Sequence, residues 1–145
     1  MGERTERTVI NHLIETCRDA ERGFRTAAKC VNSAETKRLF LRLAEQRHTF
    51  VEELLPHAHR LGGAADADGT RIAKAHRTWM RVRAGFASDP EPVIVREAVR
   101  GERYAVAAYD DAIHDMLPPD TRGLVEAQDL SVRIAGRLVA NMAAD

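Results

Sequence analysis

The sequence has no excess of charge of either sign and no long run of apolar residues. Among its 145 residues, 22 are Lys or Arg and 22 are Asp or Glu, so the formal net charge is zero. A protein that binds nucleic acid needs a surplus of basic residues, and we therefore expect no nucleic-acid partner. A membrane-spanning helix needs roughly 18 to 20 consecutive apolar residues, which no stretch provides, so we expect no membrane association.

The sequence also has few cysteines and none of the common enzyme motifs. Cys17 and Cys30 fall in one predicted helix, roughly 20 Å apart, which is too far for a disulfide between them. The charged N-terminus MGERTERTVI lacks the apolar core of a signal peptide. The two cysteines that cannot pair and the lack of this apolar core both favour a reduced, cytoplasmic protein. No CxxC, GxGxxG, P-loop or GxSxG is present, and no nucleophile lies beside an identifiable base, so an enzyme is the less favoured interpretation.

Aromatic residues make up only 5% of the chain, whereas hydrophobic residues make up 44% and charged residues 30%. This composition favours packed helices over sheets and is sufficient for a single domain spanning residues 1–145. Apolar residues recur at helical spacing between strong breakers, which are Asn32-Ser33, Gly62-Gly63 and Pro118-Pro119. The pattern predicts four long helices and one short helix, over residues 8–31, 34–61, 71–86, 90–116 and 120–142.

The lengths of the breaks predict how these helices connect. The breaks near Asn32 and Pro118 are short, which favours two antiparallel helical hairpins. The connection from Gly63 to Asp89 is long enough to run the length of a helix, and it carries the short helix. We therefore predict an all-α fold, a ferritin-like four-helix bundle of two antiparallel hairpins joined by a long crossover. Asn32 followed by Glu35 further predicts a capping box at the start of the second long helix.

Several stretches of the sequence resemble a known family. They are LIETCRDAERGFRTAA, LFLRLAEQRHTFVEEL, LGG, HRTWM, RGERYAVAAYDDAI and LPPDTRGLVEAQ, which together cover nearly the whole chain. In combination they resemble a bacterial, mainly proteobacterial, family of four-helix-bundle proteins of unknown function that is grouped with the ferritin-like folds. The resemblance implies a ferritin-like topology and brings no established activity, so any chemistry has to be argued from the residues.

Three charged residues fall on the apolar faces of the predicted helices. At about 100° per residue, Glu21 and Glu102 each lie within roughly 40° of a row of apolar residues on their helices. Two buried carboxylates are costly unless a neighbouring group neutralises them. Arg47 lies near the centre of the apolar face of its helix, close to the level of Glu21, and its planar guanidinium can serve two carboxylates. We therefore predict a buried Glu21–Arg47–Glu102 network.

A further buried polar contact is predicted across the last hairpin. A turn near Pro118 places Tyr109 opposite Gln128, and a buried tyrosine hydroxyl usually finds a hydrogen-bond partner. We therefore expect Tyr109 to hydrogen-bond to Gln128. The predicted buried polar network comprises Glu21, Arg47, Glu102, Tyr109 and Gln128.

A metal site is the alternative use of these carboxylates. Ferritin-like di-iron sites take a Glu from each of two helices and a Glu-x-x-His motif from each of the other two. Glu21 and Glu102 match the single glutamates, and Glu45 with His48 forms one Glu-x-x-His. The last helix has no second copy, and Glu45 and His48 lie roughly 160° and 100° from the centre of their apolar stripe. We therefore favour no cofactor, with an incomplete iron or manganese site formed by Glu21, Glu45, His48 and Glu102 as the alternative.

These features favour a non-enzymatic bundle that acts by self-association or by binding another protein. Helices of this length usually carry a second, moderately apolar face, and Leu39, Phe50, Ala107 and Ile134 are the residues expected to supply it. A homodimer or a complex with a protein partner is therefore expected. The competing interpretation is a metal-binding ferritin-like protein or oxidase. Binding of a small apolar ligand between the helices is a third interpretation, which no residue pattern specifically supports.

Overall fold

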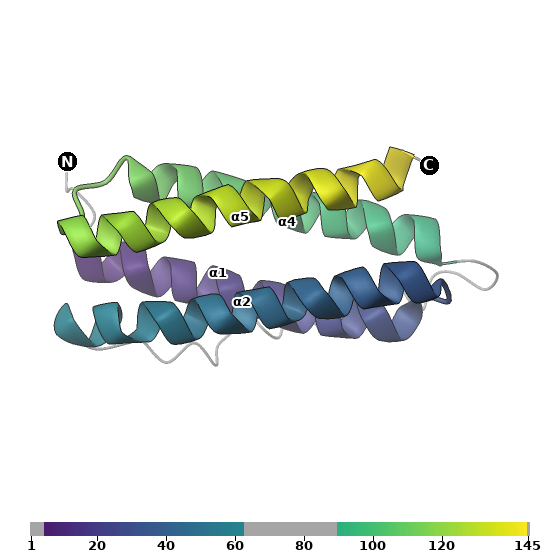
Figure 1. Ribbon diagram of the computed structural model, residues 1–145, viewed down its shortest axis with the longest axis horizontal. Helices are drawn as coiled ribbons and strands as arrows, with labels where there is room; N and C mark the ends of the chain where they lie inside the picture. Colours follow the sequence, from purple (N-terminus) through teal and green to yellow (C-terminus); the bar gives the residue numbers. More distant parts are fainter. Residues whose placement is uncertain (1–4, 63–89, 145) are drawn as a thin grey trace.

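The computed structural model describes residues 5–62 and 90–144, which form four α-helices and no strand (Figure 1). The prediction of an all-α four-helix bundle is confirmed. Each helix begins and ends within three residues of its predicted bounds, and the short helix expected over 71–86 lies outside the described residues. The helices are α1 (Glu6–Cys30), α2 (Ala34–Arg60), α4 (Glu91–Ile113) and α5 (Pro119–Ala144).

The four helices are arranged as two antiparallel hairpins, α1 with α2 and α4 with α5 (Figure 1). The hairpins pack through α1 against α4 and, less closely, through α2 against α5. Within the described ranges α2 and α4 are therefore diagonal to each other across the bundle. Figure 1 also shows that α2 ends at one end of the bundle and α4 begins at the other, which is the arrangement that a crossover connection requires.

A carboxylate at the start of α4 holds the turn of the first hairpin. Ser33, and not Asn32, caps α2, because the Ser33 hydroxyl accepts from the backbone N–H of Thr36 at 3.3 Å. The expected capping box with Glu35 is therefore wrong by one residue. The Glu91 carboxylate accepts from the backbone N–H groups of both Asn32 and Ser33, at 3.0 Å each, so unpaired donors of this turn are satisfied from the other hairpin.

The helix α4 ends at Ile113, three residues before the predicted end. Helix ends leave backbone carbonyl groups without a partner, and here the guanidinium of Arg122 supplies one. It donates to the carbonyl oxygen of Ile113 at 2.8 Å and to that of Asp115 at 2.6 Å. The start of α5 therefore caps the end of α4, which allows the chain to leave the helix before Pro118.

The apolar interior is divided into two clusters along the bundle. The first core cluster lies toward the end where α4 turns into α5, and the second lies toward the end where α1 turns into α2. Both clusters are made of residues that recur at helical spacing, as amphipathic helices require. The first cluster includes Val9, Leu13, Cys17, Phe50, Leu54, Ala105, Tyr109 and Val125, and the second includes Phe24, Phe40, Leu43, Ala44, Ile94, Ala98, Ala135 and Val139.

None of the four described helices contains a segment that is both long enough and apolar enough to cross a bilayer. Each of them instead mixes one apolar side with many charged positions.

Candidate functional site

The centre of the bundle contains an ion pair between Arg47 of α2 and Glu102 of α4. Both residues are almost completely buried, with 1% and 2% of their surfaces exposed. The contact is bidentate, because Nη1 of Arg47 donates to Oε1 of Glu102 at 2.7 Å and Nη2 donates to Oε2 at 2.5 Å. This is the strongest geometry available to a guanidinium and a carboxylate.

The surroundings of Arg47 keep its charge in place despite the burial. Burial alone disfavours the charged guanidinium, but the hydrogen bonds and the negative charge of Glu102 outweigh it, so the pKa of Arg47 is raised. The guanidinium carbon also lies 5.7 Å from the ring centre of Phe24, within the range of a cation–π contact. Its Nε donates to the side-chain oxygen of Gln46 at 3.3 Å. The charge is therefore contacted on several sides.

The position of this ion pair coincides with the boundary between the two core clusters. On α2, Ala44 belongs to the second cluster and Phe50 to the first, with Arg47 between them. On α4, Ala98 and Ala105 flank Glu102 in the same way. The pair thus links the two helices that are diagonal across the bundle, and a shift of either helix by one turn would bury two unpaired charges.

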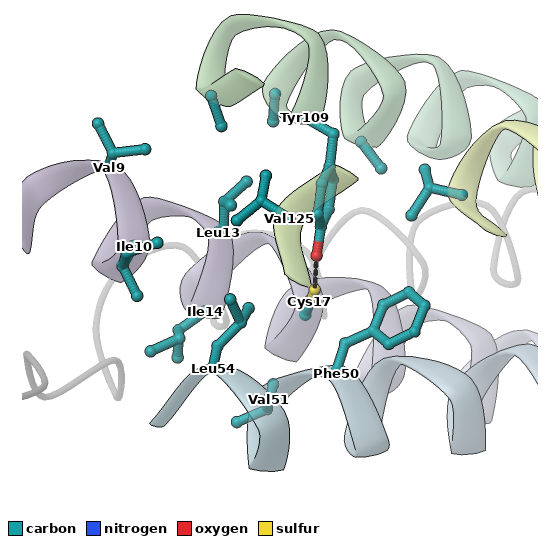
Figure 2. Packing of buried hydrophobic residues seen from close by; sticks show 14 of the residues in the cluster. Val9, Ile10, Leu13, Ile14, Cys17, Phe50, Val51, Leu54, Tyr109 and Val125 are labelled. Atoms are coloured by element: carbon teal, nitrogen blue, oxygen red, sulfur yellow. Dashed lines mark hydrogen bonds between the residues drawn. The ribbon is translucent and has the colours of Figure 1, made fainter. Parts of the chain in front are cut away.

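A chain of hydrogen bonds runs beside the ion pair through all four helices. Tyr109 of α4 donates its hydroxyl hydrogen to Oε1 of Gln128 on α5 at 2.6 Å, the contact that the hairpin register predicts. Its oxygen lies 3.2 Å from Sγ of Cys17 on α1 (Figure 2), so the thiol is the donor to the tyrosine. The amide nitrogen of Gln128 then donates to the carbonyl oxygen of Phe50 at 3.4 Å and to the carboxylate of Glu53 at 3.1 Å, both on α2.

The thiol of Cys17 and the hydroxyl of Tyr109 both have raised pKa values. Burial raises the pKa of Cys17 from 9.0 to about 11, although the hydrogen bond with Tyr109 and the charge of Arg47 partly oppose the rise. Burial likewise raises the pKa of Tyr109 well above its usual range, and the neighbouring Cys17 adds to the effect. A nucleophilic cysteine needs a lowered pKa and access to substrate. Cys17 has neither, so the chain of hydrogen bonds positions helices and offers no reactive thiolate.

Glu21 does not join the buried ion pair, and this part of the predicted network is wrong. Its carboxylate accepts from Nε of Arg25 at 3.1 Å and lies 3.3 Å from Nδ1 of His48, with 19% of the side chain exposed. The reason is the width of the buried face of α1, which packs against both α2 and α4. The middle of that face lies near Leu13 and Phe24, roughly 75° from Glu21 around the helix.

The four residues of the metal alternative do not come together at one site in the structure. Glu102 binds Arg47 in the interior. Glu21 and His48 contact each other at the surface, and the side chain of Glu45 is 66% exposed beside Arg25. Over residues 5–62 and 90–144, no group of three or more His, Cys, Asp or Glu side chains is arranged to hold a metal ion. The residues at the centre of the bundle do not fit a di-metal centre, because an arginine occupies the position facing the buried glutamate.

The expected second apolar face is only partly present. Phe50 is 8% exposed and belongs to the first core cluster, and Leu39 is partly buried and packs against the second. Ala107 and Ile134 are exposed. Leu130 and Leu138, which were not among the predicted residues, are exposed on the same side of α5 as Ile134. Their spacing of four residues from Ile134 was the available signal.

Comparison with known families finds a match over most of the chain. The family model for a domain of unknown function, DUF2383, matches residues 5–115, which include α1, α2 and α4 with Arg47, Glu102 and Tyr109. The chain belongs to this family. The DUF2383 domain carries no assigned activity, and the matched residues end before α5 begins. No match was found among curated proteins.

Proposed function

We propose that this DUF2383 protein is a non-catalytic, ferritin-like bundle of the bacterial cytoplasm that acts by associating with further copies of itself. The observation that carries the non-catalytic assignment is the bidentate contact between Arg47 and Glu102 at the centre of the bundle. In a ferritin-like carboxylate site the inward glutamates bind metal, and here the inward glutamate is neutralised by a guanidinium. The centre of the bundle then serves to specify helix register.

The remaining polar groups of the interior support the same conclusion. Tyr109, Cys17 and Gln128 satisfy one another, and the high pKa of Cys17 keeps its thiol protonated. Both cysteines are free, as expected in a reducing compartment. Function is therefore assigned to the outer surface of the bundle, where several large apolar side chains are exposed.

Two measurements on purified protein test this proposal. Elemental analysis of protein from cells grown with iron and manganese should find less than stoichiometric metal, and chelator should leave the melting temperature unchanged. Light scattering should give a mass above the 16.1 kDa of one chain at high protein concentration. Stoichiometric iron or manganese would replace the proposal with a metal-binding function. A mass of one chain at every concentration would rule out self-association.

A further inference from the structure

The outer side of α5 carries an apolar stripe that is continuous over three helical turns. Leu130, Ile134 and Leu138 are 61%, 49% and 45% exposed. Because they are spaced four residues apart, each lies within roughly 40° of the mean direction of the three around the helix. Ala127 and Asn141 continue the same line and are exposed as well. This set of five residues, the α5 stripe, faces away from the core positions of the helix.

From the proposed self-association and this stripe, we infer that two copies of the chain pair through α5, with the two helices antiparallel around a two-fold axis level with Val132. This axis sets Leu130 of each copy against Ile134 of the other, so the apolar side chains cover each other. The contact is isologous, because the same stripe serves both copies. It leaves the α1, α2 and α4 surfaces outside the interface.

Charges beside the stripe select this orientation. Glu126 and Arg137 lie on one flank of the stripe, roughly 80° and 60° from Ile134 around the helix. In an antiparallel pair equal flanks face each other, and an axis level with Val132 brings Glu126 of each copy to within about one residue of the level of Arg137 in the second copy. Two symmetric ion pairs result, whereas a parallel pairing would place uncharged residues opposite both side chains.

Both charged groups are available for such a contact. Arg137 has no ion-pair partner among residues 5–62 and 90–144, and Glu126 has only a 3.7 Å contact with Arg122 on its own helix. Arg133, the next arginine on this flank, is already held by Asp129 and Asp110 at 3.0 Å each. One helix from each copy makes a small interface, so the dimer should depend on concentration.

Sedimentation equilibrium over a series of protein concentrations tests the inference. The unaltered chain should show a reversible monomer–dimer equilibrium, and the variant Leu130→Asp/Ile134→Asp should be monomeric throughout. The matched control is Leu41→Asp on α2, which alters a residue of similar exposure, 42%, on another helix and should leave the dimer intact. Far-UV circular dichroism checks that each variant keeps its helices.

Charge reversal gives a sharper test that leaves the apolar residues in place. Glu126→Arg alone and Arg137→Glu alone should each raise the dimer dissociation constant about tenfold, and the two together should restore it. If the Leu130→Asp/Ile134→Asp variant still forms the dimer, or if the two charge reversals do not compensate each other, the α5 interface is overturned while self-association stands. A chain that is monomeric at every concentration would overturn self-association itself.

Discussion

Arg47 and Glu102 form their ion pair across the diagonal of the bundle, from two helices that do not pack directly against each other in the described part of the chain. The contact passes between two apolar clusters, and each charge is the other's counter-ion. Buried pairs of this kind often add little net stability, because the cost of removing both charges from water offsets their attraction. Removing only one of the two charges is strongly destabilising, because the other charge is then buried without a counter-ion.

Replacing only one member of this pair should be far more harmful than replacing both. Arg47→Met leaves the Glu102 carboxylate buried without a counter-ion, so we expect a loss of about 3 to 5 kcal/mol in the free energy of unfolding. Arg47→Met with Glu102→Leu removes both charges and should cost much less. Chemical denaturation of the two variants measures the difference, and equal losses would show that the pair is not coupled.

Glu21 should behave as a surface residue. Its contacts with Arg25 and His48 are partly exposed to solvent, and such ion pairs contribute little. We expect Glu21→Gln to lower the free energy of unfolding by less than about 1 kcal/mol. The same denaturation experiment provides the measurement, with Glu102→Gln as the contrasting buried variant. A loss for Glu21→Gln as large as that for Glu102→Gln would restore Glu21 to the central network.

The hydroxyl of Tyr109 should be worth one buried hydrogen bond. Tyr109→Phe keeps the ring but leaves Oε1 of Gln128 without its donor, so we expect a loss of about 1 to 2 kcal/mol. A double-mutant cycle with Gln128→Met isolates the contact between the two side chains. A coupling energy near zero would mean that the hydrogen bond contributes nothing to stability.

The two cysteines should differ in reactivity. Cys17 is 1% exposed and its pKa is raised to about 11, whereas Cys30 is only partly buried. Because the thiolate is the reactive form, a thiol reagent at pH 8 should label Cys30 in the folded protein and leave Cys17 unlabelled. Both should react after unfolding in denaturant. Mass spectrometry of the labelled peptides identifies the site, and rapid labelling of Cys17 in the native state would contradict the structure.

Stability should fall in alkaline solution. Burial raises the pKa of Cys17 from 9.0 to about 11, so above about pH 9 the unfolded chain loses this proton while the folded chain retains it. The folded state then binds more protons, and the free energy of unfolding decreases by up to about 1.4 kcal/mol per pH unit until about pH 11. Tyr109 adds to the decrease at higher pH, since its pKa is also raised.

The Cys17→Ala variant tests the origin of this slope. It should show a shallower decrease between pH 9 and pH 11 than the unaltered protein, whatever its stability at neutral pH. Denaturation curves at a series of pH values provide the measurement. Identical slopes in the two proteins would show that Cys17 does not cause the pH dependence.

The helices could be predicted from the sequence because local signals agree with the fold. Apolar residues recur at helical spacing, and Asn32-Ser33 and Pro118-Pro119 interrupt them at the turns. Arg47 could be found because a guanidinium at the centre of an apolar face requires a buried partner. The details of the caps could not be predicted, since the donors of the first turn are satisfied by Glu91 from the other hairpin.

The error at Glu21 has a specific cause. Face angles give the direction of one residue relative to others, but the width of the buried arc depends on how many neighbours a helix has. The helix α1 has two neighbours, α2 and α4, so its buried arc extends well past the row of residues that includes Glu21.

The ion pair that separates the two apolar clusters also divides the interior into compartments. Leu13 and Phe40 belong to different clusters with the bidentate ion pair between them, so we expect a change of side-chain size near Leu13 to be accommodated by its own cluster and not by repacking around Phe40. A change of side-chain size in one compartment therefore has to be compensated by residues of the same compartment. The packing of each half of the molecule can then change independently of the other half.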